Sequence, residues 1–167
     1  MNDLCYDLIK SPIGTVVIVC GGGAMQSLNF LDRKPDAAAG ATRARDPLGY
    51  STRIKAYFDG DLTALDSIAV KPDGTPFQQL VWKALLDIPA GRTDTYGGLA
   101  QRIGRPSAVR AVGLANGQNP ISLVIPCHRV IGANGKLTGY GGGLDRKQWL
   151  LEHEGFNTTA PLFSDPR

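Results

Sequence analysis

The sequence has no long hydrophobic run, few cysteines and only two histidines, and each scarcity excludes a class of protein. No stretch of about 18 consecutive apolar residues occurs, so the sequence predicts no membrane-spanning helix. The first ten residues carry Asp3 and Asp7 and lack the basic and then apolar pattern of a signal peptide. We therefore expect a cytoplasmic protein.

The three cysteines are Cys5, Cys20 and Cys127. An odd number in a chain without an export signal favours reduced thiols over a disulfide framework. A structural zinc site needs about four ligands, but His128 and His153 are both far in sequence from Cys5 and Cys20. The sequence thus predicts no metal site.

The composition, 43% hydrophobic and 20% charged in 167 residues, is that of a globular protein that buries a core without disulfides. The turn-forming Lys71-Pro72-Asp73-Gly74 is the best domain boundary. Residues 1–70 hold seven basic and eight acidic side chains, and residues 71–167 hold eleven and seven. That positive excess is compatible with a polyanionic partner without deciding the matter.

We expect an α+β fold, in which a small N-terminal sheet-plus-helix lobe over 1–72 supports and packs on a mostly helical domain over 73–167. Strands are predicted over 5–9, 15–20 and 24–31, then a polar connection over 33–46 and a helix over 47–58. Thr75 is expected to cap a helix that begins at Pro76. Its predicted buried face comprises Phe77, Leu80, Val81, Ala84, Leu85 and Ile88.

Two short helices around a glycine-containing turn are predicted next. A helix is predicted over 96–103, directly after the capping cluster Thr93-Asp94-Thr95. It is expected to end in a tight turn at Gly104-Arg105-Pro106. Ser107 is expected to cap a second helix from Ala108 to about Asn116. This order is typical of a DNA-binding helix-turn-helix, although helical hairpins without DNA function share it.

A reactive cysteine, Cys127, is predicted near the end of the apolar segment ISLVIPCHRV (121–130). A cysteine reacts as its thiolate, and His128 and Arg129 are both groups that lower a thiol pKa. Adjacent side chains on an extended chain point to opposite sides, so an inert buried Cys127 beside a surface His128 is the alternative.

The glycine-rich segment that follows has Tyr140 at its centre, with glycines at 135, 139, 141, 142 and 143. Without a GxxxxGK[ST] pattern, a backbone pocket wall with Tyr140 against a flat ligand is favoured over a phosphate cradle. Asp145 is expected to cap a final helix that contains Trp149 and ends near His153-Glu154-Gly155.

These segments together resemble the methylated-DNA–protein-cysteine methyltransferases, also called O6-alkylguanine-DNA alkyltransferases. The resemblance is dense over about 75–156 and only general over the first 70 residues. The motifs that carry it are Thr75-Pro76-Phe77-Gln78, Val81-Trp82, Arg110-Ala111-Val112-Gly113, Gly117-Gln118-Asn119-Pro120, Pro126-Cys127-His128-Arg129-Val130, Gly139-Tyr140-Gly141-Gly142-Gly143-Leu144 and Trp149-Leu150-Leu151-Glu152-His153-Glu154-Gly155.

The resemblance implies direct DNA repair, in which an alkyl group passes once and irreversibly from O6-alkylguanine, or O4-methylthymine, to Cys127. It implies no cofactor. His128 is expected to deprotonate Cys127 through a water, and Glu154 to orient His128. The Tyr96 hydroxyl is expected to protonate the leaving guanine at N3.

The same resemblance implies a substrate-binding set. Tyr140 is expected to pack against the base, and the Gly141 amide to bond the alkylated oxygen. The carbonyls of Cys127 and Val130 are expected to accept from the exocyclic amine, and Asn119 to brace the turn before the active-site strand. Some members carry serine where this chain has Gly141, which affects the tolerance for bulky alkyl groups.

The partner implied is double-stranded DNA, bound in the minor groove with the damaged base flipped out. Arg110 is expected to fill the gap in the base stack, and Ala108 to allow close approach to the groove. Gly104, Arg105 and Ser107 are expected phosphate contacts. We expect a monomer.

Some relatives bind zinc through two cysteines and two histidines, but this chain has no histidine before His128. A lesion-binding protein without transfer, a transcription regulator and a cysteine hydrolase are the alternatives. The combination of Cys127, His128 and Glu154 favours alkyl transfer over lesion binding alone. No additional DNA-binding domain fits in the first 70 residues, which disfavours the regulator, and nothing resembles an oxyanion hole with a separate base, which disfavours the hydrolase.

Overall fold

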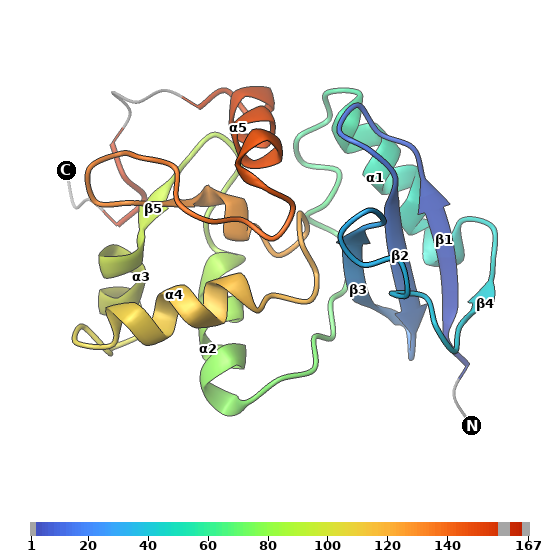
Figure 1. The fold of residues 1–167 in the computed structure, drawn as a ribbon, viewed down its shortest axis with the longest axis horizontal. Coiled ribbons are helices and arrows are strands. Elements are labelled where there is room, and N and C mark those ends of the chain that lie inside the picture. The colour runs from blue at the N-terminus through green and yellow to red at the C-terminus, as the bar shows by residue number, and fades with distance from the viewer. Residues whose placement is uncertain (1–2, 157–160, 165–167) are drawn as a thin grey trace. The chain divides into compact units, whose positions relative to one another are not determined.

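The computed structural model describes residues 3–156 and 161–164, which divide into two compact units (Figure 1). Unit 1 comprises residues 3–73 and a returning segment, 120–124; unit 2 comprises the rest. A sheet with one helix in unit 1 and a mainly helical unit 2 confirm the predicted α+β class. Among the described residues, no helix has the length and hydropathy to cross a bilayer.

Unit 1 is built on a four-stranded sheet in the order β3-β2-β1-β4. Its strands are β1 (Cys5–Ile9), β2 (Val16–Gly21), β3 (Ala24–Phe30) and β4 (Thr42–Arg43). The three predicted strands are confirmed. Strand β4, which pairs parallel to β1, lies inside the predicted polar connection and was missed because two residues show no periodicity.

Helix α1 (Tyr50–Phe58) buries Ile54 and Tyr57 and packs on the sheet (Figure 1). This helix is shorter than the one predicted over 47–58, because residues Pro47–Gly49 form a separate 3-10 turn. Leu48 has φ 58° and Gly49 has φ 77°, and left-handed backbone ends one helix before the next begins.

Unit 2 contains four α-helices in its described part. They are α2 (Pro76–Leu85), α3 (Tyr96–Arg102), α4 (Val109–Gly117) and α5 (Leu144–His153). The Thr75 cap is confirmed: Thr75 Oγ1 accepts from Gln78 N at 3.1 Å, and Gln78 Oε1 accepts from Thr75 N at 2.8 Å.

The predicted buried face of α2 is partly wrong. Val81, Ala84, Leu85 and Ile88 are buried, but Leu80 is 37% exposed. Trp82 is buried instead, because its indole Nε1 donates to the Ala115 carbonyl at 2.8 Å. The hydrogen bond of the indole thus allows Trp82 to be buried, although helical periodicity alone leaves it outside the predicted buried face.

Two predicted helix caps are also wrong. Helix α4 begins after Ala108, which makes no side-chain cap bond, and Ser107 is exposed in the preceding turn. That turn closes through the backbone, since Ala108 N donates to Arg105 O at 2.9 Å. Helix α5 begins after Gly143, whose φ of 96° favours glycine, and Asp145 lies in the first turn, where a carboxylate favours the helix dipole.

A two-stranded parallel ladder connects the two parts of unit 2 that carry the predicted chemistry. Strand β5 (Asp94–Thr95) pairs with β6 (Val130–Ile131). Tyr96 follows β5 directly, and the Cys127–Arg129 turn precedes β6 directly. This pairing, which the sequence did not predict, therefore places Tyr96 near the cysteine turn although 31 positions separate them in the chain.

Candidate active site

The candidate nucleophile, Cys127, opens a 3-10 turn, Cys127–Arg129, and is 6% exposed. The extended geometry assumed for Cys127 and His128 is therefore wrong, because a tight turn follows Pro126. Asn119 Nδ2 donates to the Ile125 carbonyl at 2.8 Å, two residues before the thiol. This contact is the one that the predicted bracing role of Asn119 requires.

A buried triad of His128, Arg129 and Glu154 lies beside the thiol. His128 Nε2 is 2.9 Å from Glu154 Oε2. Arg129 donates to both carboxylate oxygens, from Nε at 2.8 Å and from Nη2 at 2.9 Å, and its Nη1 donates to the Ile88 carbonyl at 2.6 Å. Arg129, expected only as a positive charge near Cys127, thus fixes the carboxylate that contacts His128.

The charges of this triad determine which histidine nitrogen carries the proton. Burial raises the pKa of Glu154, but His128 and Arg129 outweigh it and hold that pKa far below its usual range. Burial lowers the pKa of His128, despite Glu154. An ionised Glu154 can only accept, so neutral His128 donates from Nε2 and its Nδ1 is the proton acceptor. Nδ1 has no hydrogen-bond partner in the described chain.

The thiol itself rests in its protonated form. Burial raises the pKa of Cys127, and a hydrogen bond with Asn119 and the charge of Lys147 oppose that effect without cancelling it. A protonated buried thiol requires a base before it can attack. The available acceptor at His128 Nδ1 fits that requirement.

Lys147 is a buried residue of this site that the sequence did not single out. It is fully buried on α5, and its Nζ donates to the carbonyls of Val130 at 2.7 Å and Thr138 at 2.8 Å. Burial lowers its pKa to about 8. The signal was present in the sequence, since Lys147, Leu150, Leu151 and Glu154 follow the i, i+3, i+4, i+7 spacing of one buried face.

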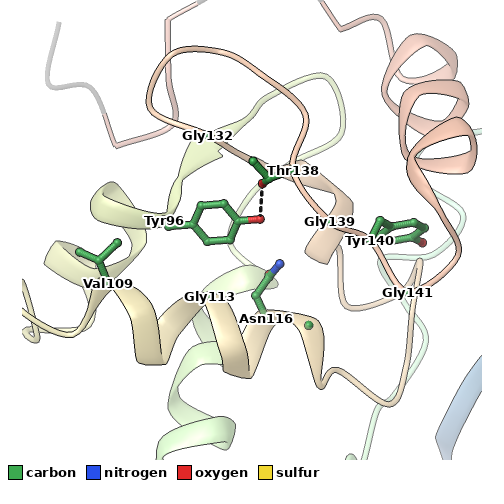
Figure 2. A pocket seen from close by; sticks show the side chains of 10 residues that line it. Tyr96, Val109, Gly113, Asn116, Gly132, Thr138, Gly139, Tyr140 and Gly141 are labelled. Atoms are coloured by element: carbon green, nitrogen blue, oxygen red, sulfur yellow. Dashed lines mark hydrogen bonds between the residues drawn. The ribbon is translucent and has the colours of Figure 1, made fainter.

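A cavity of about 530 Å³ opens next to this machinery within unit 2 (Figure 2). Tyr96, Tyr140 and Gly141, all predicted site residues, line it. The Tyr140 ring lies edge-on to the His128 imidazole, with 6.4 Å between centroids. The remaining lining residues are Val109, Gly113, Asn116, Gly117, Gly132, Thr138 and Gly139. The volume suits one flat, base-sized ligand.

Two lining residues that the sequence did not single out contact predicted ones. The Thr138 hydroxyl shares a hydrogen bond with the Tyr96 hydroxyl at 2.7 Å, the dashed line in Figure 2. Asn116 Nδ2 donates to the Cys127 carbonyl at 3.5 Å. Cys127 is not itself among the residues that line the cavity in the described chain. Asn116 therefore connects the cavity wall with the turn that carries the thiol.

The predicted DNA contacts lie together between α3 and the first turn of α4. Gly104, Arg105, Ser107 and Arg110 are exposed, and Ala108 is half-buried. The connection between the two helices runs over 103–108, longer than the three-residue turn expected. All five residues thus form one continuous stretch of surface that could face DNA.

The described residues contain no group of three or more histidine, cysteine or acidic side chains able to hold a metal. Cys5 and Cys20 are direct partners across β1 and β2, and both are free thiols. His153, which had no predicted role, stacks on Trp149 with 4.7 Å between ring centroids.

Comparisons with known proteins agree on one family. Residues 76–156 match the model of the 6-O-methylguanine DNA methyltransferase, DNA binding domain. A methylated-DNA–protein-cysteine methyltransferase of Salmonella typhimurium is 57% identical over 93% of this chain and 98% of its own length. One of Mycobacterium bovis is 48% identical over 94% and 96%. The crystal structure of Mycobacterium tuberculosis OGT in complex with DNA, 48% identical, matches with a TM-score of 0.83 over 90% of this chain and 92% of that one.

Proposed function

The chain belongs to the methylated-DNA–protein-cysteine methyltransferase family, and we propose that it repairs duplex DNA by moving the alkyl group of O6-alkylguanine onto Cys127. The observation that carries the proposal for this residue is the buried His128–Glu154 pair, which begins at the residue next to Cys127. The acceptor His128 Nδ1 has no hydrogen-bond partner among the described residues. In the transfer a carbon–sulfur bond forms as the carbon–O6 bond breaks. The thioether that results is not reversed by any group in the site, so each molecule reacts once.

The proton of the thiol moves first. His128 Nδ1 takes it through a bridging water, and the imidazolium that forms is stabilised by the ionised Glu154. Arg129 holds that carboxylate at both oxygens, which keeps its position during the reaction. The sulfur is then a soft, strong nucleophile suited to displacement at carbon.

The leaving guanine takes the electrons of the broken bond and needs a proton. We assign its delivery at N3 to the Tyr96 hydroxyl, which lines the cavity and shares its hydrogen bond with Thr138. Tyr140 packs on the base and the Gly141 amide contacts the alkylated oxygen. Apart from its chain neighbours, a Cβ atom at Gly141 would meet no described atom within 4 Å, so the serine of other family members would fit here without displacing protein atoms.

The carbonyls of Cys127 and Val130 are proposed to accept from the guanine amine. The Val130 carbonyl accepts from Lys147 Nζ, whereas the Cys127 carbonyl accepts both from Asn116 Nδ2 and from the backbone N–H of Val130. A carbonyl oxygen has two lone pairs, so the Val130 carbonyl has more capacity left for the amine than the Cys127 carbonyl has.

The damaged base reaches the cavity by leaving the DNA stack. The exposed stretch from Gly104 to Arg110 is proposed to lie in the minor groove, with Arg110 stacked in the space that the base vacates. The support is the exposure of Arg110 in the first turn of α4, the helix that also contributes Val109, Gly113 and Asn116 to the cavity wall.

Replacing Arg110 by alanine is expected to slow transfer from a fully paired duplex by about tenfold or more, because flipping a paired base costs a few kcal/mol. Transfer from the same lesion in a single strand is expected to change little. Single-turnover rates on the two DNAs measure this. Arg53→Ala, another exposed helical arginine, is the control and keeps both rates. Equal slowing on both DNAs contradicts the stacking role.

The function is tested by intact-protein mass spectrometry after mixing the protein with a duplex that carries one O6-methylguanine. The expected result is a gain of one methylene, mapped to the peptide that contains Cys127. Tight, lesion-selective binding without a mass gain identifies a lesion-binding protein instead. Neither transfer nor selective binding overturns both functions.

Three finer parts of the proposal are O4-methylthymine as a second substrate, a monomeric state and a cytoplasmic location. All groups assigned to the transfer lie in unit 2 of one chain, which supports the monomer. Reduced cysteines support the cytoplasm.

A further inference from the structure

The Asn116 side chain is a polar group of the cavity wall whose hydrogen bonding is only half complete in the described chain. Asn116 is 4% exposed and projects from α4 toward the cavity (Figure 2). Its Nδ2 donates to the Cys127 carbonyl at 3.5 Å, whereas its Oδ1 is buried and has no hydrogen-bond partner among the described residues. Buried amide oxygens in proteins are normally bonded, so this one calls for a donor.

The direction of the amide follows from its surroundings. Turning the amide over would place Oδ1 against the Cys127 carbonyl, an arrangement of two acceptors that cannot bond. Nδ2 therefore stays on the Cys127 carbonyl, and the buried atom of Asn116 that is left without a partner among the described residues is the acceptor Oδ1.

The chemistry of alkylated bases limits what this acceptor can bind. Alkylation at O6 removes the proton from N1 of guanine, so the exocyclic 2-amino group is the only N–H donor on the base. O4-alkylthymine has lost its N3 proton in the same way and carries no N–H donor. An acceptor in the cavity wall therefore distinguishes the two lesions.

We propose that Asn116 is a specificity-determining residue, whose Oδ1 accepts a hydrogen bond from the 2-amino group of the flipped O6-alkylguanine. The inference rests on the proposed function. The amine has two N–H groups to donate, and the Cys127 carbonyl already accepts from Asn116 Nδ2 and from the Val130 backbone N–H, so Asn116 Oδ1 is the more available partner for one of them. Since a backbone carbonyl cannot be removed by mutation, Asn116 is the one of these acceptors that a variant can delete.

The test compares two bases that differ only in the amine. Single-turnover transfer is measured from duplexes with O6-methylguanine and with O6-methylhypoxanthine, which lacks the 2-amino group, for wild type and Asn116→Leu. The rate on O6-methylguanine divided by the rate on O6-methylhypoxanthine is expected to fall about threefold to tenfold in the variant. A fall of that size corresponds to the loss of one neutral hydrogen bond. Displacement of Cys127 or a weakened fold slows both substrates and leaves the ratio unchanged.

Two further variants make the result decisive. Asn116→Ala removes the amide without adding volume and is expected to lower the ratio as leucine does. Gln148→Leu makes the same chemical change at an exposed position of α5 and is expected to keep the wild-type ratio. The rate on O4-methylthymine is expected to follow that on O6-methylhypoxanthine in every variant.

The outcomes separate this inference from the function it rests on. A wild-type ratio retained by both Asn116→Leu and Asn116→Ala overturns the role of Asn116, while transfer by the wild type upholds the proposed function. No transfer by the wild type from any of the three bases overturns the proposed function itself.

Discussion

Replacing Cys127 by serine is expected to abolish alkyl transfer to the protein, with a loss of about 10⁴-fold or more. A hydroxyl is a poorer nucleophile toward carbon than a thiolate, and its proton is held more tightly than that of a thiol, so His128 activates it less effectively. Serine is close to cysteine in volume, so the buried turn that carries residue 127 is expected to keep its shape. Intact mass after incubation with O6-methylguanine DNA measures transfer, and binding to the same DNA shows that the variant is folded.

The matched control is Cys20→Ser, another buried cysteine, which lies on β2 of unit 1. It is expected to take up one methyl group per molecule, as the wild type does. If Cys127→Ser still gains a methylene, the acceptor is another residue and the assignment of Cys127 is wrong.

Replacing Glu154 by glutamine is expected to reduce both stability and transfer rate. The change removes the charge that faces two Arg129 nitrogens and leaves a guanidinium that is 7% exposed without its counter-charge. Breaking a buried ion pair in this way costs about 3–5 kcal/mol. The transfer rate is expected to fall by about 10²–10⁴-fold, because the His128 tautomer with a free Nδ1 is no longer held.

Urea unfolding measures the first effect and single-turnover kinetics on O6-methylguanine DNA the second. Glu152→Gln, an exposed carboxylate on the same helix, is the control and is expected to change neither by much. A variant that is destabilised but transfers at the wild-type rate would show that Glu154 supports the fold alone.

The same residue predicts how stability depends on pH. Because the pKa of Glu154 is lower in the folded than in the unfolded chain, its stabilisation is fully present above the unfolded value and is lost as the pH falls toward the folded value. The difference in the free energy of unfolding between wild type and Glu154→Gln is thus expected to shrink progressively below about pH 4, near the ordinary glutamate pKa. Urea unfolding of both proteins from neutral to acid pH measures the difference. A constant difference contradicts the buried, ionised carboxylate.

Much of this protein was predictable from local patterns. The family suggested by the motifs around Cys127 is confirmed by the match over 76–156 and by relatives that cover nearly the whole chain. Apolar and β-branched runs predicted the first three strands, and Thr75 with Pro76 predicted the start of α2. These features depend on residues within a few positions of one another, so the sequence itself contains the signal.

The errors arose where a short element or a backbone turn decided the outcome. Strand β4 and the β5–β6 ladder have two residues per strand, too few to show a period. Ser107 and Asp145 have the chemistry of caps, but the backbone bond at Ala108 and the positive φ of Gly143 placed the helix starts elsewhere.

What the sequence determined by itself is the set of reactive groups: a thiol at 127, an imidazole at 128 and a carboxylate at 154, on motifs spaced as in the family. What only the tertiary structure decided is how the buried polar side chains pair. Arg129 meets Glu154 across 25 positions, Lys147 holds the Val130 and Thr138 carbonyls, and Asn116 spans from the cavity wall to Cys127. Periodicity indicates that a residue faces the interior, but its hydrogen-bond partner comes from a segment distant in the sequence. Leaving a buried polar group unpaired costs free energy, so the stable fold is one that supplies such a partner.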